Sequence, residues 1–248
     1  MKKIVIASDS FKGSVTSMEV ADAAETAIKR IFPGCEVVKT AVADGGEGTI
    51  EALVGSLNGT IINCTIKGPL MEPVTAHYGI LGDNTTAVIE MASASGLTLI
   101  PEEQRNPLLT STFGTGELIK DALERGCRKF LIGIGGSATN DAGTGMLQAL
   151  GFKFLNKENR ELKNGGQILK NISAIDRSEV IPEVFNSNFT IACDVENPLT
   201  GPNGAAHVYA KQKGADDEMI AVLEEGMKHF AQVIAEREGK DIEKVPGA

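Results

Sequence analysis

Short apolar runs alternate with amphipathic stretches in the first sixty residues of the chain. Residues 3–8 (KIVIAS) and 36–42 (EVVKTAV) are apolar enough for buried parallel strands, and apolar residues recur at helical spacing between them. Thr16 and Glu19 stand ahead of that predicted helix at the spacing of a capping box. A second helix is predicted over residues 50–57. This β-α-β-α order predicts a parallel sheet covered by helices.

The pattern changes after Gly59, where predicted strands follow one another without helices between them. These strands cover residues 60–66, 74–80 and 86–90. The tripeptide at residues 82–84 (GDN) between the last two predicts a hairpin turn. Because consecutive strands of this kind pair antiparallel, we expect a mixed sheet and a second domain from about residue 65.

The second half of the chain returns to alternating strands and helices. The predicted helices cover residues 117–125 and 218–237, and the predicted strands cover residues 130–134, 167–175 and 189–193. The whole chain is therefore expected to have an α/β fold.

A glycine-rich segment follows the predicted strand at residues 130–134. Its small and polar residues are Gly135, Gly136, Ser137, Thr139, Asn140 and Asp141. Glycines in such a turn let the backbone approach a ligand, and the free N–H groups at the start of a helix attract anions. An ordinary turn between a strand and a helix is the alternative interpretation. The polar side chains favour a loop that faces a ligand.

Composition and charge narrow the function. With 42% hydrophobic and 23% charged residues, the 248-residue chain is typical of globular proteins. A net charge of −9, no tryptophan and 4% aromatic residues argue against a nucleic-acid-binding surface. No apolar stretch approaches the roughly 18 residues of a membrane helix, and the N-terminus lacks the apolar core of a signal peptide. We expect a cytoplasmic protein with no nucleic-acid or membrane partner; the sequence does not indicate its oligomeric state.

Four acids lie in the polar or glycine-rich loops that follow predicted strands, namely Asp9, Asp44, Asp141 and Asp194. Ligands of parallel sheets bind at the carboxyl ends of the strands. Helix capping or turn formation explains any single aspartate about as well as a ligand does, but four at strand ends favour a shared site. The sequence has no Walker loop, no GxGxxG fingerprint and no GxSxG elbow, which excludes P-loop kinases and argues against dinucleotide enzymes and serine hydrolases.

Together with nearby glycines and Lys12, these acids supply the groups that phosphoryl transfer requires. That reaction needs backbone N–H groups and a cation around the phosphates, a carboxylate for Mg²⁺ and a base for the attacking hydroxyl. Lys12 supplies a candidate cation, with a solvated surface lysine as the alternative. The candidate N–H groups belong to Gly45, Gly46, Gly135 and Gly136. The residues alone thus predict a phosphate-binding α/β enzyme.

Six segments resemble motifs of the bacterial glycerate kinase family, in the family's order and across almost the whole chain. They are KIVIASDSFKGS, VADGGEGT, IEMASASGL, TSTFGTGEL, IGIGGSATNDAGTG and ACDVENPLTGPNGA. The resemblance implies transfer of the γ-phosphoryl group of ATP, with Mg²⁺, to a hydroxyl of D-glycerate, usually giving 2-phosphoglycerate. The sequence does not distinguish this from 3-phosphorylation.

The resemblance also implies two α/β domains with the active site between them. One is flavodoxin-like and is built from both ends of the family's chain around an inserted domain. Residues 1–65 would form its N-terminal part, and residues 66–248 would form the second domain with the mixed sheet. Family members continue beyond residue 248. If this chain is a fragment, we expect it to lack kinase activity and to expose an unpaired sheet edge.

Site roles follow from the resemblance as expectations. Asp194 would orient or deprotonate the glycerate hydroxyl, and Asp44 is the alternative for that role or a contact to Mg²⁺. The groups expected to hold the glycerate carboxylate or the phosphoryl group belong to Ser10, Lys12, Gly45, Gly46 and Gly48, and Asp9 is expected at the same site. The loop at residues 135–141 would bind either ATP phosphates or glycerate, and the metal ligands stay unassigned. Two alternatives remain: a non-catalytic binding module for a small phosphorylated or carboxylated metabolite, and a kinase for another hydroxy acid.

Overall fold

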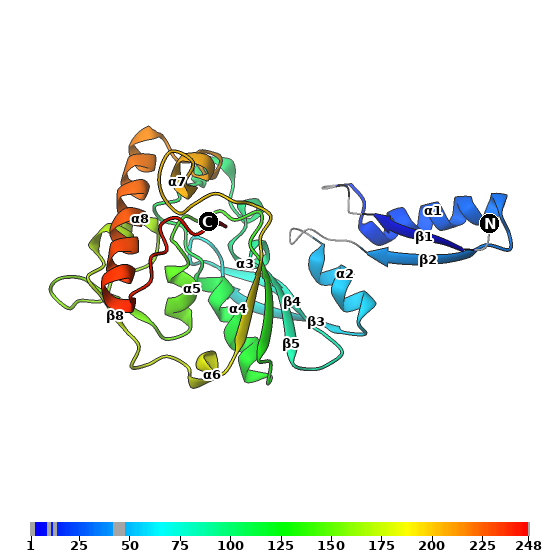
Figure 1. Cartoon of the computed structure of the whole chain (residues 1–248), viewed down its shortest axis with the longest axis horizontal. Helices are drawn as coiled ribbons and strands as arrows, with labels where there is room; N and C mark the ends of the chain where they lie inside the picture. The colour runs from blue at the N-terminus through cyan, green and yellow to red at the C-terminus, as the bar shows by residue number, and fades with distance from the viewer. Residues whose placement is uncertain (1–2, 9–10, 12–13, 42–47, 248) are drawn as a thin grey trace.

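The N-terminal strands and the first helix form a small unit. The structure is a computed structural model, and it describes residues 3–8, 11, 14–41 and 48–247. Strands β1 (Lys3–Ser8) and β2 (Glu36–Ala41) pair in parallel, and helix α1 (Ser17–Ile31) packs on both (Figure 1). The predicted capping box is confirmed, since Thr16 Oγ1 accepts from the Glu19 amide and Glu19 accepts from the Thr16 amide. The predicted parallel pairing is confirmed as well.

The prediction that residues 3–8 form a buried strand is wrong. Residues along β1 alternate between exposed and half-buried, and 60% of Val5 is exposed. The two-stranded sheet is covered by α1 on one face, so the side chains that point to the other face meet no described neighbour layer (Figure 1). Apolar composition identified the strand but not the number of layers around it.

A five-stranded mixed sheet forms the centre of the larger body, as predicted. Its strands, in spatial order, are β3 (Thr60–Lys67), β4 (Pro73–Ile80), β5 (Thr86–Glu90), β6 (Lys129–Gly133) and β9 (Asn188–Ala192). The pairs β3–β4 and β4–β5 are antiparallel, whereas β5–β6 and β6–β9 are parallel. The predicted hairpin joins β4 to β5, where the Asp83 carboxylate accepts from the amides of Thr85 and Thr86. The expected domain boundary at residue 65 falls within β3, which pairs with β4 along its whole length.

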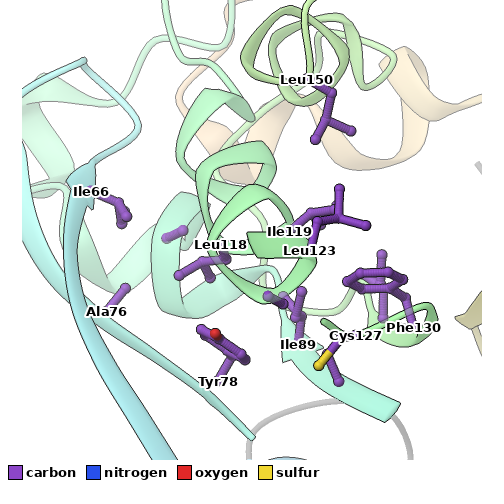
Figure 2. Close-up of a cluster of buried hydrophobic side chains, with 14 residues drawn as sticks. Ile66, Ala76, Tyr78, Ile89, Leu118, Ile119, Leu123, Cys127, Phe130 and Leu150 are labelled. Carbon is purple, nitrogen blue, oxygen red and sulfur yellow. The ribbon is translucent and has the colours of Figure 1, made fainter. Parts of the chain in front are cut away.

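Helices cover both faces of this sheet. Helix α2 (Thr49–Ser56) packs through Ile50 against Val88 of β5 on one face. The opposite face of β5 carries Ile89, which belongs to a core with α4 (Phe113–Glu124). Figure 2 shows this core, in which Leu118, Ile119 and Leu123 of α4 gather with Tyr78, Ile89 and Phe130 of the strands.

A second core surrounds the long C-terminal helix α8 (Asp217–Glu238), close to its predicted bounds. The prediction of a strand over residues 167–175 is wrong for most of its length. Residues Gly166–Asn171 form the 3-10 helix η3, and only Ala174–Asp176 form a strand, β8, which pairs with β7 (Lys153–Leu155). The apolar residues of η3, Ile168 and Leu169, pack in the core around α8.

The remaining elements are short. They are α3 (Ala92–Ser95), α5 (Thr144–Ala149), α6 (Pro182–Phe185), α7 (Ala205–Tyr209), η1 (Leu97–Leu99), η2 (Glu102–Gln104) and η4 (Lys211–Lys213). None of the helices in the described ranges is long and apolar enough to cross a membrane.

Candidate active site

A cavity of about 770 Å³ lies at the carboxyl ends of the parallel strands β5, β6 and β9. Glu90 at the end of β5 lines it, as do the glycine-rich loop after β6 and Asp194 after β9. This is the edge at which parallel sheets bind ligands. The mixed sheet therefore brings together two of the strand-end acids predicted from sequence, Asp141 and Asp194.

The loop after β6 forms one wall of the cavity. All six of its predicted site residues line the space, namely Gly135, Gly136, Ser137, Thr139, Asn140 and Asp141. Gly136 has a φ of +73°, which favours glycine, and its carbonyl accepts from the Leu97 amide. The Ala138 amide donates to the Ser95 carbonyl 2.8 Å away. Backbone bonds on both sides thus fix the loop against the segment that follows β5.

Asp141 is buried, and its carboxylate is fully engaged by the protein. It accepts from the amide and hydroxyl of Thr112 at 2.8 and 2.9 Å, and from the amides of Gly143 and Gly145 at 3.1 and 3.2 Å. Burial raises the pKa of this carboxyl, and the four donors act in the opposite direction. These contacts tie the start of α4 to the start of α5. They favour a structural role for Asp141, and its expected contact with substrate stays a prediction.

Asp194 has the opposite environment. It is exposed at the carboxyl end of β9, and within the described ranges its carboxylate has no hydrogen-bond or ion-pair partner. The loop that carries it is nevertheless held in place. Asn197 accepts from the Tyr209 hydroxyl at 2.6 Å and from the Gly247 amide at 3.0 Å. A free carboxylate on a fixed loop is suited to accept a proton or to orient a hydroxyl.

Lys213 adds a cation that the sequence did not indicate. It ends η4, it is 8% exposed, and it lines the cavity. Its ammonium donates to the Ser137 hydroxyl at 2.8 Å and to the Thr139 carbonyl at 2.6 Å. Burial lowers the pKa of Lys213 to about 8, while the charge of Asp141 acts in the opposite direction. In the sequence this residue is one of two lysines in a polar stretch, which suggests a solvated side chain.

Glu90 was also missed as a site residue. It ends β5, it is 7% exposed, and its Oε1 atom accepts from the Ile50 amide at 3.0 Å. The Thr49 amide donates to the same carboxylate, so Glu90 caps the start of α2. Burial raises the pKa of Glu90, and the two amides oppose that shift. An acid as the last residue of an apolar strand was the available signal, whereas the four aspartates were selected because they lie in the loops that follow strands.

The sequence comparison decides the family. The model of the glycerate kinase family matches residues 4–248. The chain belongs to the glycerate kinase family. It is 50% identical to the glycerate kinase of Bacillus subtilis strain 168 over 246 residues, and 48% identical to the glycerate 2-kinase of Escherichia coli K12 over 246 residues.

A solved structure supports this relationship at the level of the fold. The crystal structure of a Salmonella typhimurium LT2 protein, assigned as a glycerate kinase 2, superposes with a TM-score of 0.94 at 45% identity. This match covers 99% of the chain and 66% of the Salmonella protein. The chain also spans 64% of the Bacillus relative and 65% of the Escherichia relative.

The family's N-terminal motifs are only partly visible in the structure. Six of the predicted site residues lie outside the described ranges, namely Asp9, Ser10, Lys12, Asp44, Gly45 and Gly46. Gly48 is described, and it stands before α2 with a φ of +96°. Since Glu90 caps that helix, it links the helix that follows the ADGGEGT motif to the cavity wall.

The predicted Mg²⁺ can be tested against the available donors. Among the residues that the structure describes, no three His, Cys, Asp or Glu side chains gather as a metal site. Mg²⁺ in kinases binds through one or two carboxylates together with substrate phosphates and water. The free oxygens of Asp194 fit that requirement, so this residue would hold a Mg²⁺ ion that arrives with ATP if Asp44 is the base.

Proposed function

We propose that this chain serves the ATP-dependent phosphorylation of D-glycerate, with the reacting groups held in the cavity at the ends of β5, β6 and β9. One observation carries the proposal. The free carboxylate of Asp194 and the buried ammonium of Lys213 line one cavity, in a chain about 50% identical to named glycerate kinases over nearly all its length. This pairing of a base and a cation is what phosphoryl transfer to an anionic alcohol requires.

In the proposed mechanism, Asp194 accepts a hydrogen bond from the substrate hydroxyl, orients its oxygen and takes its proton as the phosphoryl group is transferred. Gly135 and Gly136 line the cavity, and in this mechanism their backbone N–H groups donate to an anionic oxygen of the substrate. When bound, Mg²⁺ would neutralise part of the negative charge of the ATP phosphates. The name of the Escherichia relative, a glycerate 2-kinase, supports the 2-hydroxyl as the acceptor.

A coupled assay of ADP release tests this proposal. Because the chain spans about 65% of its relatives, the assay uses both residues 1–248 and a chimera. In the chimera, residues 4–247 replace the matching part of the Escherichia glycerate 2-kinase. We expect the chimera to release ADP in a reaction that depends on D-glycerate, and residues 1–248 alone serve as the comparison. A chimera that folds but neither releases ADP nor binds either substrate in calorimetry would overturn the proposal.

Variants of the chimera test the individual roles. Asp194→Asn should lower turnover by about 10²- to 10⁴-fold, the range for loss of a general base. Asp217→Asn is the matched control, because Asp217 is an exposed aspartate at the start of α8, away from the cavity. Asp44→Asn tests the alternative base. Unchanged turnover in both Asp194→Asn and Asp44→Asn would refute the assignment of the base.

A non-catalytic binding module is the second candidate, because a cavity lined by a cation and polar groups can bind a small anion without catalysis. Calorimetry of residues 1–248 with D-glycerate and with MgATP separates the two. Binding of one ligand without ADP release in either protein supports the module.

A panel that includes tartronate and larger sugar acids tests the third candidate, a kinase for another hydroxy acid. Identification of the product by NMR distinguishes 2- from 3-phosphorylation.

A further inference from the structure

Lys213 carries a buried positive charge that no acid neutralises directly. Its two acceptors, the Ser137 hydroxyl and the Thr139 carbonyl, are both uncharged. Within the described part of the chain, no carboxylate oxygen lies within 4.0 Å of its ammonium. The nearby Asp141 carboxylate is already occupied by four donors. Burying a charge without an ionic partner is costly, so such a residue marks a functional site more often than a structural one.

The position of Lys213 in the cavity allows its charge to attract an anionic substrate. Among the described residues that line the cavity, it is the only lysine or arginine. The same wall carries the acids Glu90, Asp141 and Asp194. Both D-glycerate and ATP are anions, which three carboxylates would repel without a compensating cation. An ammonium has three donors, and Ser137 and Thr139 take two of them.

We propose that Lys213 binds an anionic oxygen of the substrate, either in the glycerate carboxylate or in the terminal phosphate of the nucleotide. Through its bonds to Ser137 and Thr139 it also holds the glycine-rich loop against that oxygen. The choice of glycerate and the nucleotide as the two ligands rests on the proposed function. The chemistry they share is a compact oxyanion, and the third donor of the ammonium is the group that recognises it.

The proposal has a signature in pH. Lys213 loses its proton near pH 8, so binding of the oxyanion should weaken as pH rises through that value. The other titratable groups of the cavity wall are His77, Glu90, Asp141, Cys193, Asp194 and Tyr209. A variant that lacks only the ammonium separates the titration of Lys213 from theirs. A lysine that only tethers the loop would not couple its protonation to a ligand.

NMR titrations of residues 1–248 with sodium sulfate and with D-glycerate test this, since sulfate imitates a phosphoryl group and glycerate presents the carboxylate. Both probes keep their charge between pH 7 and 9. We expect one probe to bind the wild type and to bind Lys213→Met about 10- to 100-fold more weakly, the loss of one charge-assisted hydrogen bond. Lys211→Met should bind within twofold of wild type, because Lys211 is exposed on the same short helix. The probe that responds identifies the source of the oxyanion.

A second measurement needs no folded variant. The side-chain carbon resonance of Lys213 in the wild type reports its pKa, which should rise when the oxyanion binds, because a nearby anion favours the charged ammonium. Equal binding to Lys213→Met, or a pKa that does not move at saturating probe, would overturn the role of Lys213 and leave the proposed kinase function standing. Failure of both probes to bind the wild type would also overturn it, while the ADP assay of the chimera judges the function independently.

Discussion

Two aspartates that look alike in the sequence have opposite surroundings in the structure. Both follow a strand of the mixed sheet and both line the cavity, yet Asp141 is 1% exposed with four donors around it, whereas Asp194 is exposed and has no partner in the described ranges. Burial separates a residue that organises the site from one that can act on a ligand. Stability measurements can detect this separation without any assay of activity.

Asp141→Asn should destabilise the fold by about 1–3 kcal/mol, because an amide offers one acceptor oxygen in place of two and leaves buried donors unsatisfied. Asp194→Asn is the matched control and should leave stability within about 0.5 kcal/mol of wild type, as exposed substitutions usually do. Chemical denaturation of both variants measures this difference. Equal stability of the two variants would show that the bonds to Asp141 contribute nothing net.

Lys213 makes stability depend on pH in a direction that can be worked out. Burial lowers the pKa of Lys213 from about 10.5 in the unfolded chain to about 8 in the folded chain. Between these values the unfolded chain keeps a proton that the folded chain has released, so raising the pH favours the folded state. The unfolding free energy of wild type relative to Lys213→Met should therefore rise, by up to about 3 kcal/mol, from pH 8 to pH 10.5. Denaturation curves of both proteins across this range check the sign, and a flat or falling difference would contradict it.

The site residues predicted from the sequence depend on neighbours close in the sequence, whereas the missed residue Lys213 depends on contacts with residues far away in the sequence. The glycine-rich loop and Asp194 follow local strand patterns, so the sequence placed them at strand ends correctly. Lys213 owes its burial to contacts with Ser137 and Thr139, 76 and 74 positions away. No local pattern carries that information, because a lysine in a polar segment is usually solvated.

At the scale of elements, local signals predicted what local chemistry determines. The capping box of α1 and the hairpin between β4 and β5 depend on neighbouring residues, and both were found. The exposure of β1 and the helical form of η3 depend on which layers pack beside them, and both were predicted wrongly. Periodicity over residues 167–175 did not separate a short helix packed on α8 from a strand.

Close packing of α4 against β3 gives a prediction at this scale. A Cβ atom at Gly114 would overlap the carbonyl oxygen of Lys67, and it would lie 2.8 Å from the side chain of Ile66. Gly114→Ala should therefore cost about 1–3 kcal/mol as overpacking. Gly55→Ala in α2 is the matched control, because nothing lies within 4 Å of its Cβ position. That change should stabilise by about 0.5–1 kcal/mol through helix propensity. Melting curves that rank the two variants in the other order would contradict this account of α4.

At the scale of the whole molecule, the buried apolar side chains are unevenly distributed. The two large cores lie around α4 and α8, and residues of both helices, Thr115 and Met227, line the cavity. In the described part of the unit formed by β1, α1 and β2, only Ala21 and Cys35 are buried apolar residues, while Val5 and Ile31 are 60% and 71% exposed. Two-stranded sheets are marginally stable without further packing. We therefore expect the stability of this unit to depend on the rest of the molecule, and the rest of the molecule to be stable without it.

Hydrogen exchange measures this dependence directly. Amides of β1, α1 and β2 should open with a much smaller free energy than those of β5 and β6, since Ala87, Val88 and Ile89 of β5 are at most 1% exposed. A shortened protein that begins at Gly48 provides the control. It should keep the exchange rates of β5 and β6, because α2 and the sheet it packs on are retained. Equal protection of β1 and β5 in the 248-residue chain, or loss of protection of β5 in the shortened one, would show that the two parts fold as one cooperative unit.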